Sequence, residues 1–122
     1  MTILNNMTTV FAALLLLGRS SAFAGVNDPT WNPPHRFDHA FPGKLTIKRL
    51  PPRDVERACR ALLVKYKIPA GSLTNWRGCS LPVSKRSCMI IVVNQTFMGA
   101  TPKAVIRHET GHCNGWPANH PN

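Results

Sequence analysis

RHETGHCNGWPANH, at residues 107–120, contains the pattern His-Glu-x-x-His from His108 to His112. If the segment is helical, two histidines four residues apart lie on one face, one turn from each other. Their imidazoles can then bind one tetrahedral Zn²⁺ ion. Glu109 is rotated by about 100° from His108 around such a helix. It is therefore placed to flank the metal and to act as general base toward a zinc-bound water.

The neighbouring residues predict the helix that this pattern needs. Thr101 and Pro102 supply an N-cap and a proline at the first helical position. The helix is expected to run from Pro102 through His112 or Cys113, because Asn114-Gly115 then ends it. The metal pattern lies in the last turns of this helix.

A catalytic zinc ion usually takes a third protein ligand. No Asp or Glu follows Glu109, so a later carboxylate is excluded, and His120 is the only later imidazole. Gly115 would let the chain turn back and bring His120 to the metal. His35 and His39, in a proline-rich region near the N-terminus, are the alternatives.

Two other residues of the segment carry expectations. Cys113 follows a candidate ligand directly, but on the helix it points about 100° away from His112. A disulfide is therefore favoured over a thiolate ligand in an exported chain. Trp116 is expected to cover the end of the helix as a structural residue rather than to contact substrate.

Upstream of this segment the sequence predicts a small sheet. Residues 45–50 alternate between apolar and polar side chains, which is typical of a half-buried strand. Residues 88–93 are continuously apolar and largely β-branched, which indicates a buried strand. Residues 72–87 are expected to be loop-like, with a short strand in the middle.

An amphipathic helix is predicted between these strands. It begins at the Pro51-Pro52 pair, and apolar residues then recur at spacings of three and four from Val55 to Tyr66. Its length is about four turns, and Pro69 and Gly71 end it. The expected fold class is therefore α+β, with a small sheet packed against an amphipathic helix and a C-terminal zinc-site helix.

The N-terminal region has a different composition. Residues 10–17, VFAALLLL, precede Ala22-Phe23-Ala24, which fits the apolar core and cleavage site of a secretory signal peptide at residues 1–24. An uncleaved anchor is the alternative, because no Lys or Arg precedes the run. Residues 25–43 are rich in Pro, Asn and His and are expected to form an extended arm or loop. The mature chain is expected to be secreted or periplasmic, without a transmembrane anchor after cleavage.

All four cysteines follow the expected cleavage site, which indicates two disulfides in an exported chain. The strand at residues 88–93 spans about 17–20 Å, and the helix at residues 102–113 spans about 17 Å. Because a short turn joins them, the helix should run back along the strand and bring Cys113 near Cys88. Cys59 would then pair with Cys79. The alternative is a Cys79–Cys88 bridge with a Cys59–Cys113 bridge between the helices.

The spacing His108-Glu109-x-x-His112-x-x-Gly115 resembles the opening of the metzincin zinc signature, within the broader zincin class of metallopeptidases. The segment also resembles that of short secreted bacterial proteins that carry an HExxHCNGWP-type sequence near the C-terminus. The resemblance covers the last fifth of the chain and the strand–turn–helix order before it. It implies a minimal zincin-like domain at residues 44–122, bound zinc and peptide-bond hydrolysis. His108 and His112 would be ligands, Glu109 the general base, and Gly115 the turn toward the third ligand.

The chain departs from the metzincin pattern after the glycine. The third histidine of that pattern would fall at Ala118, and here it comes two residues later, at His120. No methionine follows Met98, so the methionine turn beneath the metal is absent, and no tyrosine follows the motif to assist an oxyanion. These differences bear on peptidase activity more than on zinc binding.

Two functions fit these observations. The first is an exported zinc hydrolase, a metallopeptidase whose peptide or protein substrate pairs with a sheet edge at residues 45–50 or 79–93. The second is a non-catalytic secreted protein, stabilised by zinc and disulfides, that binds an acidic surface, envelope polymer or nucleic acid through its positive charge. That formal charge is +10 for the whole chain and +9 once cleavage removes Arg19. An open fourth zinc position would distinguish the first from the second, and His39 is a candidate to close it.

Overall fold

The apolar run SCMIIVV forms β3 (Ser87–Val93), the central strand of a three-stranded sheet. β1 (Lys44–Leu50) pairs with β3 in parallel and β2 (Gly78–Ser84) pairs with it in antiparallel orientation, so the order is β1-β3-β2. This computed structural model describes residues 32–71 and 74–122. The expected signal peptide and residues 25–31 of the expected arm lie outside the described residues.

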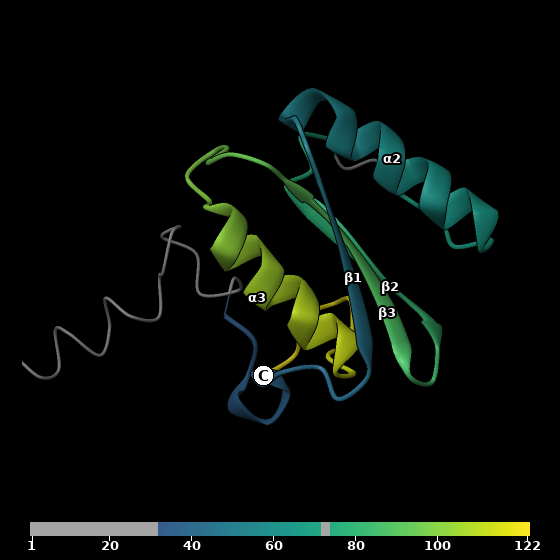
Figure 1. The fold of residues 1–122 in the computed structure, drawn as a ribbon, viewed down its shortest axis with the longest axis vertical. Helices are drawn as coiled ribbons and strands as arrows, with labels where there is room; N and C mark the ends of the chain where they lie inside the picture. The colour runs from purple at the N-terminus through teal and green to yellow at the C-terminus, as the bar shows by residue number, and fades with distance from the viewer. Residues whose placement is uncertain (1–31, 72–73) are drawn as a thin grey trace, which may run out of the picture.

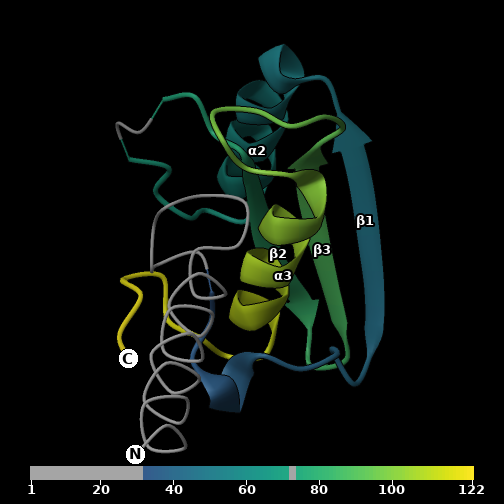
Figure 2. The ribbon, with the colours of Figure 1, turned by 90° about the vertical axis from the view of Figure 1, so that its left-hand side faces the viewer.

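A helix covers each face of the sheet (Figures 1 and 2). α2 (Pro52–Lys65) packs on one face and α3 (Pro102–Cys113) on the other. Alternate side chains of β3 therefore point to opposite faces of the sheet: Ile90 lies on the α3 face and Ile91 on the α2 face, and both are buried. A strand that is buried on both faces has no solvent-facing side on which polar side chains would be favoured. This explains why its sequence is continuously apolar.

The α+β fold class expected from the sequence is confirmed. Both predicted strands and both predicted helices are present, with bounds within one or two residues of those expected. β2 is longer than the short strand expected within residues 72–87, and Pro82 lies inside it. Proline cannot donate to a strand ladder and is confined to edge strands or bulges. Both conditions hold here, since β2 is an edge strand whose register shifts between Pro82 and Ser84.

The favoured disulfide pairing is also confirmed, which excludes the alternative. Cys59 is bonded to Cys79 with the Cα atoms 6.0 Å apart, and Cys88 to Cys113 with the Cα atoms 5.9 Å apart. The first bridge ties α2 to the sheet and the second ties the end of α3 to the sheet. Two such bridges indicate an oxidising, extracellular type of environment.

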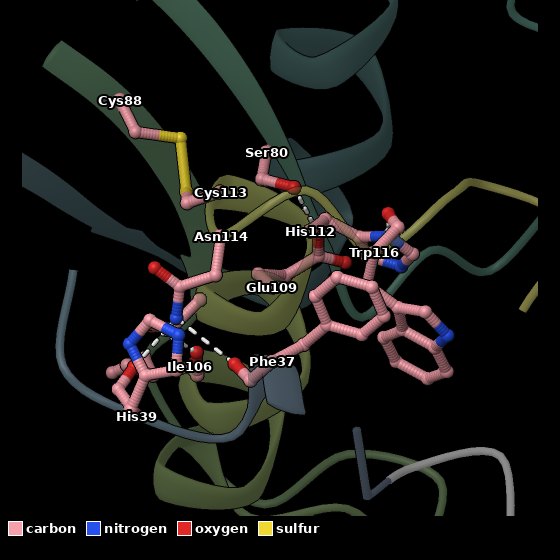
Figure 3. The surroundings of a disulfide bond; sticks show 11 residues. Phe37, His39, Ser80, Cys88, Ile106, Glu109, His112, Cys113, Asn114 and Trp116 are labelled. Carbon is pink, nitrogen blue, oxygen red and sulfur yellow. Dashed lines mark hydrogen bonds between the residues drawn. A yellow bond between two sulfur atoms is a disulfide. The ribbon is translucent and has the colours of Figure 1, made fainter. Parts of the chain in front are cut away.

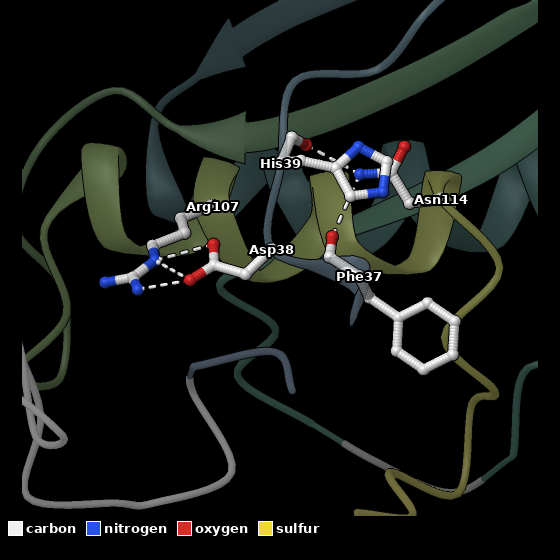
Figure 4. Close-up of polar contacts among 5 residues, drawn as sticks. All are labelled: Phe37, Asp38, His39, Arg107 and Asn114. Carbon is white, nitrogen blue, oxygen red and sulfur yellow. Dashed lines mark hydrogen bonds and ion pairs between the residues drawn. The ribbon is translucent and has the colours of Figure 1, made fainter. Parts of the chain in front are cut away.

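The described part of the expected arm packs against α3 (Figure 4). It contains a 3₁₀ turn, η2 (His35–Phe37). The Arg107 guanidinium of α3 donates to both carboxylate oxygens of Asp38, with Nε 2.9 Å from Oδ1. The Asn114 amide donates to the carbonyls of Phe37 and His39 at 2.9 and 2.6 Å. Within residues 32–71 and 74–122, no helix has the length and apolar character needed to cross a membrane.

Candidate metal centre

The N-terminal end of α3 forms as its sequence predicts. The Thr101 hydroxyl accepts a hydrogen bond from the Ala104 amide at 3.1 Å, which caps the helix. Pro102 occupies the first helical position, where its missing N–H is not needed. The helix then continues to Cys113, so His108 and His112 lie one turn apart. Their ring centroids are 4.9 Å apart.

A glycine turn ends α3 and reverses the chain. Gly115 has a φ of +104°, which a residue with a side chain rarely adopts. Its amide donates to the His112 carbonyl, and the Trp116 amide donates to the Gly111 carbonyl, both at 3.0 Å. These two bonds form a Schellman motif, which satisfies the last carbonyls of the helix. The chain thus turns back over the helix end and carries His120 toward the other two histidines.

Three imidazoles meet at this turn. The Nε2 atom of His112 lies 3.2 Å from that of His108 and 3.1 Å from that of His120, and the third distance is also 3.1 Å. Zinc–nitrogen bonds of about 2.0–2.1 Å in a tetrahedral site place neighbouring nitrogens roughly 3.3–3.4 Å apart. The observed triangle is therefore close to the spacing that one bound ion requires.

The described residues contain one such group of three or more potential ligands, and it consists of these histidines. The structure thus brings His120 to the pair, as expected from the sequence. The alternatives His35 and His39 lie outside the group, and the exposed His39 ring contacts the neighbouring Ala40 carbonyl instead. Cys113 is in a disulfide, which removes it as a thiolate ligand.

Trp116 packs against all three imidazoles and is 4 % exposed. Its ring stacks on that of His112 with the centroids 4.7 Å apart. Its carbonyl lies 2.7 Å from Nδ1 of His112 (Figure 3). A proton on Nδ1 that donates to this carbonyl leaves Nε2 as the metal-binding nitrogen.

Gly111 is a site residue that the sequence pattern did not identify. A Cβ atom at this position would lie 2.5 Å from Cγ of Pro33 and 3.2 Å from Cε3 of Trp116. Only glycine therefore lets the arm and the tryptophan close on this part of the helix. Glycine inside a helix costs about 1 kcal/mol relative to alanine. A glycine within the predicted helix is therefore the sequence signal that could have indicated a packing role at this position.

Glu109 lies beside the three histidines and is 8 % exposed. The hydroxyl of Ser80, on β2, donates to its Oε2 atom at 2.6 Å (Figure 3). Burial raises the pKa of the Glu109 carboxyl, while the Ser80 hydrogen bond and the nearby His112 act in the opposite direction. Ser80 is 29 positions away in sequence and belongs to no motif, so sequence reasoning did not find it.

The imidazoles and the carboxylate open onto one pocket of about 720 Å³. Residues 78–82 of β2 line this pocket, as do Trp116, Ala118 and His120. Leu63, Ile68 and Trp76 add apolar surface. Of the two sheet edges considered from the sequence, the β2 edge lines this pocket, whereas no residue of β1 is among the described lining residues.

The site therefore combines three nitrogen donors, a buried carboxylate and an adjoining pocket. Neutral imidazoles suit zinc and other first-row transition metals, and such a group can hold one ion with a face open to the pocket. No protein-family model, curated protein or solved structure matches this chain.

Proposed function

We propose that this protein is an exported zinc-dependent hydrolase, a metallopeptidase, with His108, His112 and His120 as zinc ligands and Glu109 as general base. The observation that carries the proposal is the triangle of Nε2 atoms 3.1–3.2 Å apart, with the Glu109 carboxylate buried beside it. Three protein ligands leave one position of a tetrahedral ion open, which is typical of catalytic zinc.

The donor set fits zinc better than it fits magnesium or calcium, which take oxygen ligands. When bound, zinc lowers the pKa of a water molecule and polarises a carbonyl group. The protein residues have separate tasks in this proposal. The imidazoles hold the ion, and the Trp116 carbonyl orients His112. Glu109 accepts the proton of the attacking water and donates it to the leaving amine.

A peptide substrate is supported by the strand that borders the pocket. β2 is an edge strand, and residues 78–82 line the pocket beside the histidines. An extended peptide can pair with such an edge through its backbone, which would lay one of its carbonyls next to the ion. The resemblance of the His108–Gly115 segment to zincins supports the same substrate class.

Export is supported by the chain's composition and its covalent structure. Both disulfides require an oxidising compartment to persist. The apolar run and A-x-A sequence before Gly25 supply a route to that compartment.

The test compares the wild-type protein with Glu109→Gln. Both proteins should contain about one zinc ion per chain, because Glu109 is not a ligand. Turnover of fluorogenic peptides by Glu109→Gln should fall by roughly two or more orders of magnitude, as expected for loss of a general base. Equal turnover by the two proteins would refute the mechanism. Zinc-loaded wild type without turnover would favour the non-catalytic protein that binds an acidic polymer or nucleic acid.

A further inference from the structure

We infer that Ser80 is a positioning residue for Glu109; this inference rests on the proposed function. The Ser80 hydroxyl donates a 2.6 Å hydrogen bond to Oε2 of the carboxylate. The contact joins two elements, because Glu109 comes from α3 and Ser80 from β2. The Glu109 side chain is thus held by a hydrogen bond from the sheet as well as by its position on α3.

The hydrogen bond assigns different roles to the two carboxylate oxygens. Oε2 is engaged by Ser80, which leaves Oε1 as the oxygen that exchanges a proton with the attacking water. A glutamate side chain has several rotatable bonds, and fixing one oxygen removes most of that freedom before substrate arrives. Such preorganisation matters because small displacements of a catalytic group cost large factors in rate.

The strand that carries Ser80 is a rigid support. Its neighbour Cys79 is bonded to Cys59 of α2, on the opposite face of the sheet. Ser80 itself lies opposite the fully buried Ile90 of the central strand. The Ser80 hydroxyl is therefore held in place by the sheet and by the Cys59–Cys79 disulfide one residue away. Its hydrogen bond in turn holds the Glu109 carboxylate in a fixed position.

A purely structural Ser80 would act differently from a positioning one. If the hydroxyl only satisfied a buried carboxylate, its removal would reduce stability and leave the turnover of the remaining folded protein unchanged. If the hydroxyl orients the base, its removal lowers kcat while KM and zinc content stay the same. The reason is that the proposed peptide pairs with the backbone of β2 and the proposed zinc ligands are imidazoles, so neither contact uses the Ser80 hydroxyl.

The experiment compares Ser80→Thr with Ser80→Val, which have similar shape and differ in the hydroxyl. Ser80→Val, and likewise Ser80→Ala, should lower kcat by roughly 10- to 100-fold, the size seen when groups that orient site residues are removed. KM and zinc content should not change. Ser80→Thr should recover most of the lost kcat. Ser84→Ala, on the same strand and outside the pocket lining, is the matched control and should keep wild-type turnover.

Two outcomes of these assays would overturn the inference. One is equal kcat for Ser80→Val and Ser80→Thr, and the other is a loss in Ser84→Ala as large as that in Ser80→Ala. The variants also need comparison in the Glu109→Gln background. There, Ser80→Ala should cause no further loss of turnover, because the group that it positions is already disabled.

A structural readout separates this inference from the proposed function. In a crystal structure of zinc-loaded Ser80→Ala, the Glu109 carboxylate should turn away from its wild-type position. A carboxylate that stays in place refutes the positioning role, whatever the activity. If wild type cleaves no peptide, the proposed function fails, and this structure alone decides whether Ser80 sets the orientation of Glu109.

Discussion

The two helices of this domain lie on opposite faces of one sheet, and each is tied to it by one disulfide. They differ in what they bury. α2 buries Val55 and Cys59, as an amphipathic helix should. α3 buries His108 and Glu109 among its apolar residues. Buried titratable groups cost stability unless they are paired, so the face that departs from the usual pattern is the one on which we propose a functional site.

The histidines of α3 and of the following turn provide the largest expected effect. His112→Ala and His120→Ala should each remove most of the zinc, since each deletes one of the three proposed ligands. His39→Ala is the matched control, because His39 is exposed and outside the cluster. Metal analysis after gel filtration measures the content per chain. Equal zinc in His112→Ala and wild type would show that this face is not a metal centre.

Removing each disulfide in turn tests whether the two faces are independent. Replacing either cysteine pair by alanine should cost about 2–4 kcal/mol in the free energy of unfolding. Only Cys88→Ala/Cys113→Ala should also weaken zinc binding, by roughly tenfold, because Cys113 follows His112 at the end of α3. Denaturant unfolding and competition with a zinc chelator measure the two effects. A similar loss of zinc affinity in Cys59→Ala/Cys79→Ala would contradict the division of roles.

Gly111→Ala tests whether packing around the metal centre outweighs helix propensity. Alanine favours the helix by about 1 kcal/mol, but its Cβ would overlap Pro33 and press on Trp116. Overpacking of this kind costs about 1–3 kcal/mol. We therefore expect lower stability and weaker zinc binding, measured by thermal unfolding and chelator competition.

The reverse exchange on the other helix is the control for this substitution. Ala61 is exposed on α2, so Ala61→Gly should lose about 1 kcal/mol through propensity alone and leave zinc affinity unchanged. A Gly111→Ala protein more stable than wild type, with full zinc affinity, would show that the arm and the tryptophan do not require glycine.

The fold and the cluster of three histidines could be predicted from the sequence wherever local patterns determine them. The N-cap at Thr101, the turn at Gly115 and the four-residue spacing of His108 and His112 are local patterns. The pairing of Cys88 with Cys113 followed from comparing the length of a strand with that of a helix. His120 was found by elimination, because no other imidazole or carboxylate follows the motif.

The remaining site residues depend on contacts between distant segments. Ser80 reaches Glu109 only because β2 lies beside α3, and no periodicity in residues 72–87 marks it. The close approach of Pro33 to Gly111 depends on how residues 32–43 fold back on α3. Contacts of this kind depend on the tertiary arrangement, so the sequence predicted an extended arm or loop where the structure has a packed segment.

The smallest expected effect concerns the ion pair that holds this segment. The hydrogen bond from Arg107 lowers the pKa of Asp38 below its ordinary value of 3.8. A depressed folded-state pKa contributes stability that is complete above the unfolded-state value and is lost as pH falls through the folded-state value. Because Arg107 is 46 % exposed, we expect a contribution of about 1 kcal/mol or less. Asp38→Asn should therefore be less stable than wild type at neutral pH and approach it in acid.

A double-mutant cycle makes the comparison with α2 quantitative. The cycle of Asp38→Asn and Arg107→Gln should give a coupling free energy in denaturant unfolding that fades below the ordinary pKa of Asp38, 3.8. The Asp54–Arg57 pair within α2 is the control, because its arginine side chain is 82 % exposed. That pair should couple by only about 0.3 kcal/mol. Equal coupling free energies in the two pairs would mean that the Asp38–Arg107 pair stabilises the contact between the arm and α3 no more than an exposed pair within one helix does.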